Sequence, residues 1–255
     1  GGSIDLEGSG STLHATSCVF FENHAINGGA VFGKDGTSIQ LYHTNITDNT
    51  GADTPPAVYG IGGGLYSFRG SLHIEYSIIA RNTVLSHGGG IYQREGTLNI
   101  YRSEIRKNTQ TSQPGNQPSW GGAGLYVYIN AVTTIRESIF HQNHAALSGH
   151  QIMARPEGNG IPSVTVVNTQ FVECSGCSSN NNFYFYEHGG TSGAAEYGTR
   201  SRRDCSDANP CTVAPFTGAC TDRTDNADHG VLCPYASSTT CPANLYKHVV
   251  RVNDL

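Results

Sequence analysis

The sequence predicts an all-β fold, a parallel β-helix of about six to seven turns with three short strands per turn. Three features recur in fixed order along the chain. A Gly-rich segment ends in an aliphatic and an aromatic residue, as at Val31-Phe32, Leu65-Tyr66, Ile91-Tyr92 and Leu125-Tyr126. A segment of alternating apolar and polar residues follows it, and an apolar residue three positions before an Asn closes the repeat. Repeats of this length are typical of solenoids and propellers.

Each repeat offers three candidate strands in chain order. The end of the Gly-rich segment is the first. The second alternates with a period of two, as in Ile39/Leu41, Leu72/Ile74 and Leu98/Ile100, which is typical of a strand. The third begins at a small residue, namely Cys18, Thr44, Ser77, Ser103, Ser138 or Thr169. Because no segment has a helical period, we expect these strands to stack turn on turn about 4.8 Å apart.

Two repeats are longer than their neighbours. Successive closing Asn residues are 26 residues apart in two repeats, but 33 and 35 residues apart in two others. The excess lies in residues 50–61 and 109–121, which are polar inserts. Each has an aromatic residue near its C-terminal end, Tyr59 in the first insert and Trp120 in the second. Both inserts leave the same corner two turns apart, and insertions on one face of a solenoid often form its binding side. Two tolerated surface loops are the alternative.

The closing Asn residues are interpreted as structural. They are Asn23, Asn49, Asn82, Asn108 and Asn143. An inward amide at the same corner of every turn can donate to one neighbouring turn and accept from the other, so these residues predict an Asn ladder. The recurrent Gly residues are expected to supply positive φ or a close approach between turns at the opposite corner.

The aromatic residues of the Gly-rich segments are candidate binding residues. If the aliphatic residues point inward, an outward row forms from Phe32, Tyr66, Tyr92 and Tyr126. Such a row can hold sugar rings or a partner surface, or it can serve stability through cross-strand stacking alone. The opposite orientation would bury the aromatic rings over the Gly positions and expose the aliphatic residues, a less favourable arrangement.

The composition indicates an extracellular protein. The net charge is −5 and no basic face is evident, so no nucleic-acid partner is expected, and no apolar run is long enough for a membrane span.

We divide the chain into a β-helix at 1–187, a flexible linker at 188–204 and a Cys-rich segment at 205–255 that caps the helix. The disulfide candidates are Cys177, Cys205, Cys211, Cys220, Cys233 and Cys241. Within the linker, Arg200-Ser201-Arg202-Arg203 matches a dibasic processing site or is a solvated basic loop.

The combined repeat resembles a known family. It pairs a Gly-Gly-Ala/Gly-aliphatic segment with Phe-x-x-Asn or Ile-x-x-Asn. This pairing is similar to the repeat of polymorphic outer-membrane proteins and related surface β-helix proteins, over about residues 1–186. The resemblance implies a right-handed β-helix on a cell surface, and adhesion as a function. The Cys-rich tail departs from that family, since it has no translocator barrel and is more like an extracellular eukaryotic module.

The expected function is a non-enzymatic extracellular scaffold or adhesin, within a larger cell-surface or filamentous assembly. A polysaccharide-binding or polysaccharide-cleaving β-helix protein is the alternative. Cleavage needs clustered carboxylates on one outer face, and the outward rows offer only Glu75 beside His73. No catalytic residue, metal site or cofactor is predicted. Protein neighbours and surface glycans are the expected partners.

Three further expectations concern single sites. Cys18 is expected to be a buried free thiol, because Cys174 lies five turns away, too far for a disulfide. Asn45 begins an Asn-x-Thr sequon and points outward, so it is a glycosylation candidate. Ile4 precedes Val31 by one turn, so the first turn is expected to present unpaired strand edges to a neighbour or a second copy.

Overall fold

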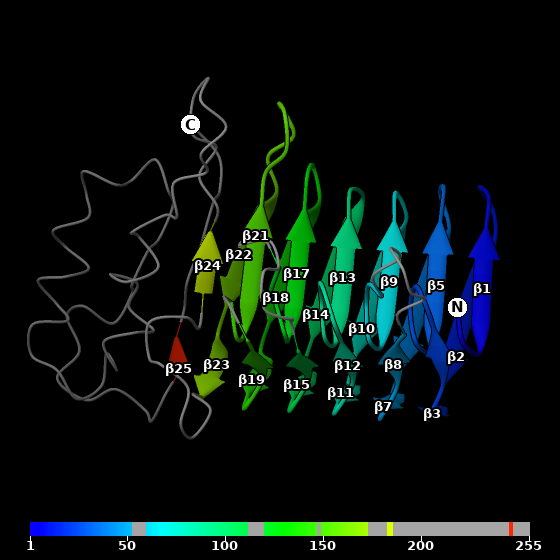
Figure 1. The fold of residues 1–255 in the computed structure, drawn as a ribbon, viewed down its shortest axis with the longest axis horizontal. Helices are drawn as coiled ribbons and strands as arrows, with labels where there is room; N and C mark the ends of the chain where they lie inside the picture. Colours follow the sequence, from blue (N-terminus) through cyan, green and yellow to red (C-terminus); the bar gives the residue numbers. More distant parts are fainter. Residues whose placement is uncertain (53–59, 112–119, 147–148, 173–182, 186–244, 247–255) are drawn as a thin grey trace, which may run out of the picture.

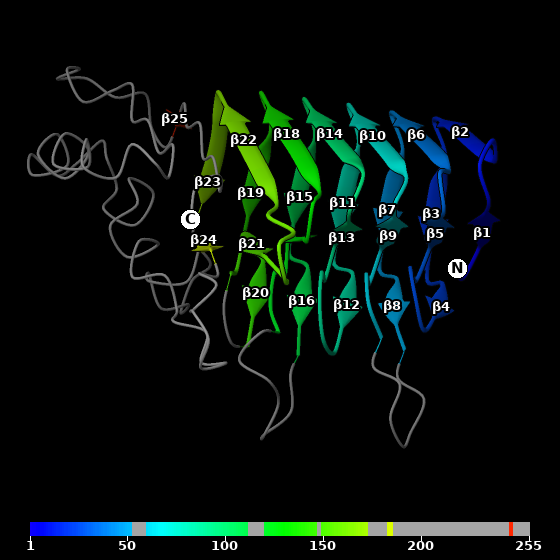
Figure 2. The same cartoon turned by 90° about the horizontal axis from the view of Figure 1, so that it is seen from above.

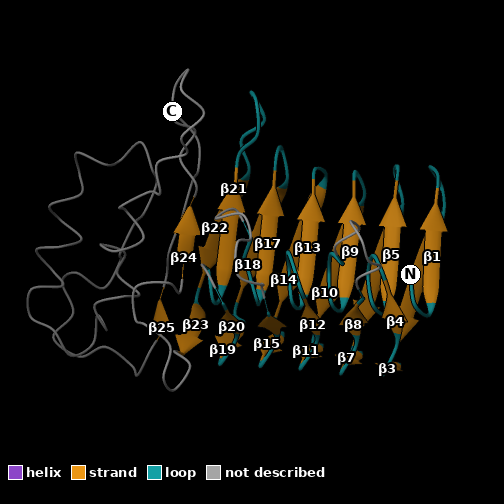
Figure 3. Cartoon of the chain, in the orientation of Figure 1, coloured by secondary structure: helices purple, strands orange, loops and turns teal. Residues whose placement is uncertain are grey.

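A computed structural model describes residues 1–52, 60–111, 120–146, 149–172, 183–185 and 245–246. These residues form a parallel β-helix without any helical segment (Figures 1 and 3). None of them forms a helix long and apolar enough to cross a membrane. The predicted fold class is therefore confirmed for this part of the chain. The linker and nearly all of the Cys-rich segment, with the six disulfide candidates and the Arg200–Arg203 motif, lie outside the described residues.

Three long sheets run the length of the helix. The first contains β1 (Ile4–Glu7), β5 (Val31–Lys34), β9 (Leu65–Phe68), β13 (Ile91–Arg94), β17 (Leu125–Tyr128), β21 (Ile152–Arg155) and β24 (Phe183–Phe185). The second contains β2 (Thr12–Thr16), β6 (Ser38–Tyr42), β10 (Ser71–Glu75), β14 (Thr97–Tyr101), β18 (Val132–Arg136) and β22 (Ser163–Val167). The third contains β3 (Val19–Phe21), β7 (Asn45–Thr47), β11 (Ile78–Ala80), β15 (Glu104–Arg106), β19 (Ile139–His141), β23 (Thr169–Val172) and β25 (Leu245–Tyr246).

The structure adds a fourth, shorter strand to the three strands predicted for each turn. A fourth sheet contains β4 (His24–Ala25), β8 (Thr50–Gly51), β12 (Thr83–Val84), β16 (Thr109–Gln110) and β20 (His144–Ala145). Each of its strands follows directly after a closing Asn, and Figure 2 shows them aligned along one side of the helix. Strands of two residues are too short to show an alternating pattern, so the sequence does not reveal them.

The register follows the repeats residue for residue. Ile4 pairs with Val31, Val31 with Leu65, and Leu65 with Ile91, so equivalent positions lie directly above one another. The inward aliphatic residues of all three long sheets therefore merge into one core that is continuous from turn to turn. Outward residues form rows in the same way, and these rows are the surfaces available for function.

The last described turn is contacted by the distal part of the chain. Strand β25 pairs antiparallel with β23, with Thr169 opposite Tyr246 and Gln170 opposite Leu245. This pairing satisfies backbone groups at the end of the third sheet that the parallel strands leave open. That the C-terminal segment caps the helix stays a prediction.

Candidate functional site

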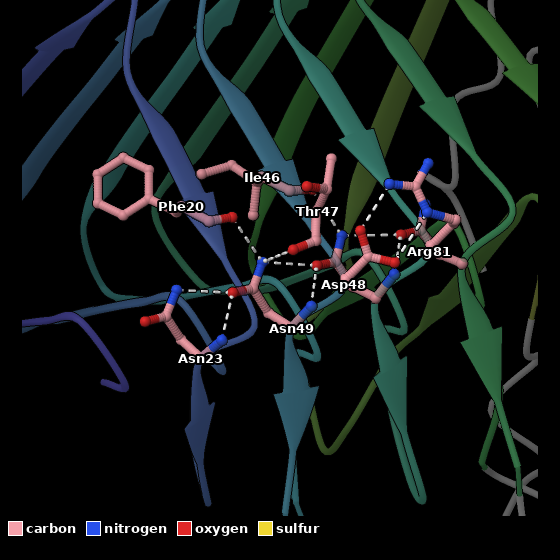
Figure 4. A network of polar contacts seen from close by, with 9 residues as sticks. Phe20, Asn23, Ile46, Thr47, Asp48, Asn49 and Arg81 are labelled. Atoms are coloured by element: carbon pink, nitrogen blue, oxygen red, sulfur yellow. Dashed lines mark hydrogen bonds and ion pairs between the residues drawn. The ribbon is translucent and has the colours of Figure 1, made fainter.

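The predicted Asn ladder is present and buried. Asn49 Oδ1 accepts hydrogen bonds from the backbone N–H of Asn23 at 3.0 Å and from its Nδ2 at 2.8 Å (Figure 4). The same two hydrogen bonds join each later ladder residue to the next one along the chain, through Asn82 and Asn108 to Asn143. The Nδ2 of Asn143 donates to Gln151, which ends the ladder among the described residues. The ladder satisfies backbone groups at the corner where the strands cannot pair, so its role is structural.

A second ladder runs parallel to it and was missed from the sequence. In the third sheet, the small residue at the start of a strand uses its hydroxyl oxygen to accept a hydrogen bond from the backbone N–H of the equivalent residue in the previous turn. Ser77 N donates to Ser103 Oγ and Ser103 N to Ser138 Oγ, each at 3.1 Å. The sequence showed that a small residue recurs here, but not that its hydroxyl bonds to a neighbouring turn.

The aromatic row points away from the main core as predicted, but it is not an exposed surface. The exposed fractions of Tyr66, Tyr92 and Tyr126 are 7%, 4% and 0%, and Phe32 is similarly buried. The rings contact one another along the row. Tyr66 and Tyr92 meet edge to face with 4.9 Å between their centroids, and Tyr92 and Tyr126 stack with 5.2 Å between theirs. The prediction that they form an exposed binding row is therefore wrong, and they form a second apolar cluster with Tyr128 and Met153.

Glycine explains why these rings are buried. Four residues before each ring stands a Gly with positive φ, and a Cβ on Gly88 would lie 2.8 Å from Cβ of Tyr92. The absence of side chains there lets each aromatic residue pack against the Gly backbone while the preceding aliphatic residue still points inward. Both faces of the first sheet are thus covered, as is usual for parallel sheets. The structure therefore combines parts of the two orientations expected from the sequence: the aliphatic residues point inward, and the aromatic rings are buried over the Gly positions.

The described end of the second insert is buried. Trp120 is 6% exposed, and its ring lies 6.0 Å from that of His87, which in turn lies 4.7 Å from Tyr126. The end of the second insert therefore contributes to the wall of the aromatic cluster. Tyr59 and both insert tips lie outside the described residues.

A row of alternating cations and aromatic rings borders the same cluster. Arg94 lies over Phe68 at 4.9 Å and over Tyr128 at 5.4 Å, and Arg155 lies over the other side of Tyr128 at 5.5 Å. The hydroxyl of Tyr128 donates to Glu157. Burial is the main cause that raises the pKa of Tyr128 to about 12 and that raises the pKa of Tyr92. These tyrosines stay neutral at physiological pH and act in packing.

A further set of aromatic residues, half-buried or exposed, lies on the second sheet. We define the second-sheet face as the outward side chains of β2, β6, β10 and β14 with the corner residues that follow these strands. Two aromatic columns run along it. In the first, the Tyr42 ring lies 5.2 Å from that of His14 and 5.5 Å from that of His73. In the second, the rings of His43 and Tyr76 stack at 5.0 Å with an interplanar angle of 4°.

The corner geometry projects the second column outward. His43, Tyr76 and Arg102 all have positive φ, with values of 48°, 48° and 44°. Tyr76 is 41% exposed, although its hydroxyl accepts a 2.9 Å hydrogen bond from Arg102. Arg102 also pairs with Glu137 at 2.7 Å. The outward rows of the second strands can be read from the sequence, but the corner residues His43 and Tyr76 follow these strands, so the repeat pattern does not predict that their rings stack.

Several acidic side chains on the described turns are paired with cations or imidazoles. Glu75 lies 3.1 Å from Nε2 of His73, and Glu104 lies 2.6 Å from Nε2 of His141 and 3.2 Å from Arg106. Asp48 pairs with Arg81 of the next turn, whose guanidinium lowers the pKa of the Asp48 carboxyl (Figure 4). No group of three or more His, Cys, Asp or Glu in the described part of the chain is placed to hold a metal ion.

Two single-site expectations are refined. Cys18 is free, as predicted, but it is only half-buried because it belongs to the first turn, and its Sγ lies 3.4 Å from the carbonyl oxygen of Thr16. Asn45 is half-buried on the outer side of β7, between Val19 and Ile78 of the neighbouring strands. Its glycosylation stays a prediction.

The geometry can be set beside known proteins. Comparison with protein-family models, with curated proteins and with solved structures finds no match for this chain.

Proposed function

We propose that the chain is a non-enzymatic β-helix scaffold or adhesin that works outside the cell as part of a larger cell-surface or filamentous assembly. One observation carries the proposal: several ion pairs of the described residues link successive turns, and the charged side chains do not converge on one point. Examples are Lys34–Glu7 at 2.7 Å and Arg69–Asp35 at 2.7 Å. Ion pairs spread in this way strengthen turn stacking, as a rod requires, whereas a hydrolase needs carboxylates gathered around a scissile bond.

The extracellular location is proposed from composition. Five Cys residues lie between residues 205 and 241, and closely spaced Cys residues in a loop-rich segment are typical of disulfide-linked extracellular modules. The sequon at Asn45 and the resemblance to polymorphic outer-membrane proteins agree with a surface location. Adhesion is the role that this resemblance favours.

The first turn supports contact with a protein neighbour. Among the described strands, β1, β2, β3 and β4 each have a parallel partner on one side. On the outer side of β3, Val19 is 65% exposed and Phe21 is 51% exposed. Exposed apolar side chains are typical of protein contact sites, so we propose that a neighbouring subunit or a second copy covers Val19 and Phe21.

A polysaccharide-active role is the second candidate. The rings of the second-sheet face favour binding of a polysaccharide. Cleavage is less favoured, because Glu75 is the only carboxylate at the outward positions of β2, β6, β10 and β14, and it is paired with His73. Binding to a glycan is compatible with an adhesin, whereas cleavage would contradict the scaffold proposal.

Two measurements test the proposed function. Incubation with a panel of neutral and acidic polysaccharides should release no reducing ends and no unsaturated products. Sedimentation should show association that rises with protein concentration and weakens in Phe21→Ser, while Ser71→Ala, an exposed change on another sheet, leaves it unchanged. Product formation, or a monomer at every concentration for the wild type, would contradict the proposal.

A further inference from the structure

The second-sheet face is chemically uniform in a way that the other faces are not. Every outward position of β2, β6, β10 and β14 carries a hydroxyl, amide, imidazole, carboxylate or phenol group. By contrast, the next strand of the second sheet, β18, exposes Val132, and the outer side of the third sheet exposes Val19, Phe21 and Ile139. Stable protein interfaces usually have an apolar centre, and this face has none over four turns. Its chemistry fits a ligand that is itself rich in hydroxyl groups.

The rings on this face are held in place before any ligand binds. Tyr42 is fixed between His14 and His73, and Tyr76 is fixed by His43 on one side and by its hydrogen bond from Arg102. Preorganised aromatic side chains lose little conformational freedom on binding, which favours affinity. Their exposed edges combine apolar C–H surface with polar atoms, the combination that a sugar ring presents in return.

The charges on this face are compensated locally. Glu75 is paired with His73, and Arg102 is paired with Glu137 at 2.7 Å. A polyanion would need unpaired cations along its path, because its affinity depends on neutralising successive charges. Charge matching therefore favours a neutral ligand over a sulfated or uronic-acid polymer.

The columns also define a direction. Rings lie on successive turns of the face, with Tyr42 on β6, Tyr76 after β10 and Tyr101 on β14, and at a strand spacing of about 4.8 Å β2 and β14 are separated by about 14 Å. We infer that the second-sheet face binds a neutral, extended polysaccharide chain that runs along the helix axis, across the strands, over Tyr42, Tyr76 and Tyr101. This inference rests on the proposed non-enzymatic surface role and names its ligand class.

Binding to defined glycans tests the inference. The wild-type chain is titrated calorimetrically with neutral β-linked gluco- and chito-oligosaccharides of two to six units, and is also tested for retention on cellulose and chitin. We expect affinity to rise with oligosaccharide length as more turns are engaged, and to change little with salt. Tyr42→Ala and Tyr76→Ala should each weaken binding about tenfold.

Matched variants separate binding from folding. Phe21→Ala removes an exposed ring from the third sheet and should bind like the wild type. Tyr76→Phe keeps the ring and loses only the hydroxyl, so it should retain more affinity than Tyr76→Ala. The inference is overturned if no neutral glycan binds, if only sulfated or uronic polymers bind with a steep salt dependence, or if Phe21→Ala loses as much affinity as Tyr76→Ala. Cleavage of a bound glycan would instead overturn the proposed function and leave the site in place.

Discussion

Asn82 donates both its backbone N–H and its Nδ2 to the Oδ1 of Asn108, 26 residues further along the chain, at 3.0 Å in each case. Asn108 in turn donates its Nδ2 to the carbonyl oxygen of Ile79 at 2.9 Å. One buried side chain therefore connects two turns through three hydrogen bonds. Stacking in this protein depends on such links as much as on the apolar core.

Replacing Asn108 with Ala should strongly destabilise the protein. The change leaves the N–H and Nδ2 of Asn82 and the carbonyl of Ile79 without their bonds in a fully buried corner. Each unsatisfied buried group costs about 1–3 kcal/mol, so we expect a loss of about 3 kcal/mol or more in the free energy of unfolding. Urea denaturation measures it, and Asn99→Ala, at an exposed position, is the control. Equal midpoints for the two variants would show that the ladder contributes nothing.

Gly88 should tolerate Ala less well than Gly8 does. Both have positive φ, 69° and 84°, but a Cβ at Gly88 would lie 2.5 Å from the carbonyl oxygen of Ile91, whereas nothing lies within 4 Å of one at Gly8. We expect about 1–2 kcal/mol of backbone strain for Gly8→Ala, and about 2–4 kcal/mol for Gly88→Ala. Thermal unfolding of the two variants compares them. A smaller loss at Gly88 would refute the packing of the aromatic rings against the Gly backbone.

Stability should fall at alkaline pH because of the buried tyrosines. Burial raises the pKa of Tyr66, Tyr92 and Tyr128 in the folded protein, the last to about 12. The folded state keeps phenol protons that the unfolded chain releases above about pH 10, so the free energy of unfolding decreases as pH rises past that value. Tyr92→Phe should lose less stability between pH 10 and 12 than the wild type does. Urea midpoints across this range provide the measurement, and parallel pH profiles for the two proteins would contradict the account.

His150 should destabilise the protein at acid pH. Burial and the neighbouring His144 lower its pKa from 6.5 to about 4, and its Nδ1 accepts a 2.9 Å hydrogen bond from the N–H of Ala145. The unfolded chain takes up a proton that the folded state excludes, so stability is full above pH 6.5 and decreases as pH falls toward 4. His150→Asn keeps an acceptor without the titration and should flatten this part of the profile. An unchanged slope between pH 6.5 and 4 in this variant would argue against the assignment.

The fold could be predicted because its signals repeat. Inward aliphatic residues and closing Asn residues recur in register, so errors at one turn are corrected by the others. The fourth sheet was missed because a pair such as Thr83–Val84 is too short for any period.

The candidate site was harder to predict because it depends on which outward rows are covered. Phe32 and Tyr92 are outward from the main core yet buried, because glycines allow a second layer to pack there. Tyr76 stays exposed and Tyr42 half-buried because no second layer covers their sheet, and Tyr42 contacts His14 and His73 at positions that are not equivalent to its own. Exposure of this kind depends on tertiary packing rather than on the repeat pattern.

Side-chain oxidative footprinting, with and without a neutral oligosaccharide, tests the central claim most directly. In the free protein Tyr76 should react rapidly and Tyr126 slowly, since the first is 41% exposed and the second is fully buried. Saturation with a hexasaccharide should protect Tyr42, Tyr76 and Tyr101 and leave Phe21 unchanged. Protection of Phe21 instead, or unaltered reactivity of all three tyrosines at saturation, would contradict the account of the second-sheet face as the binding surface.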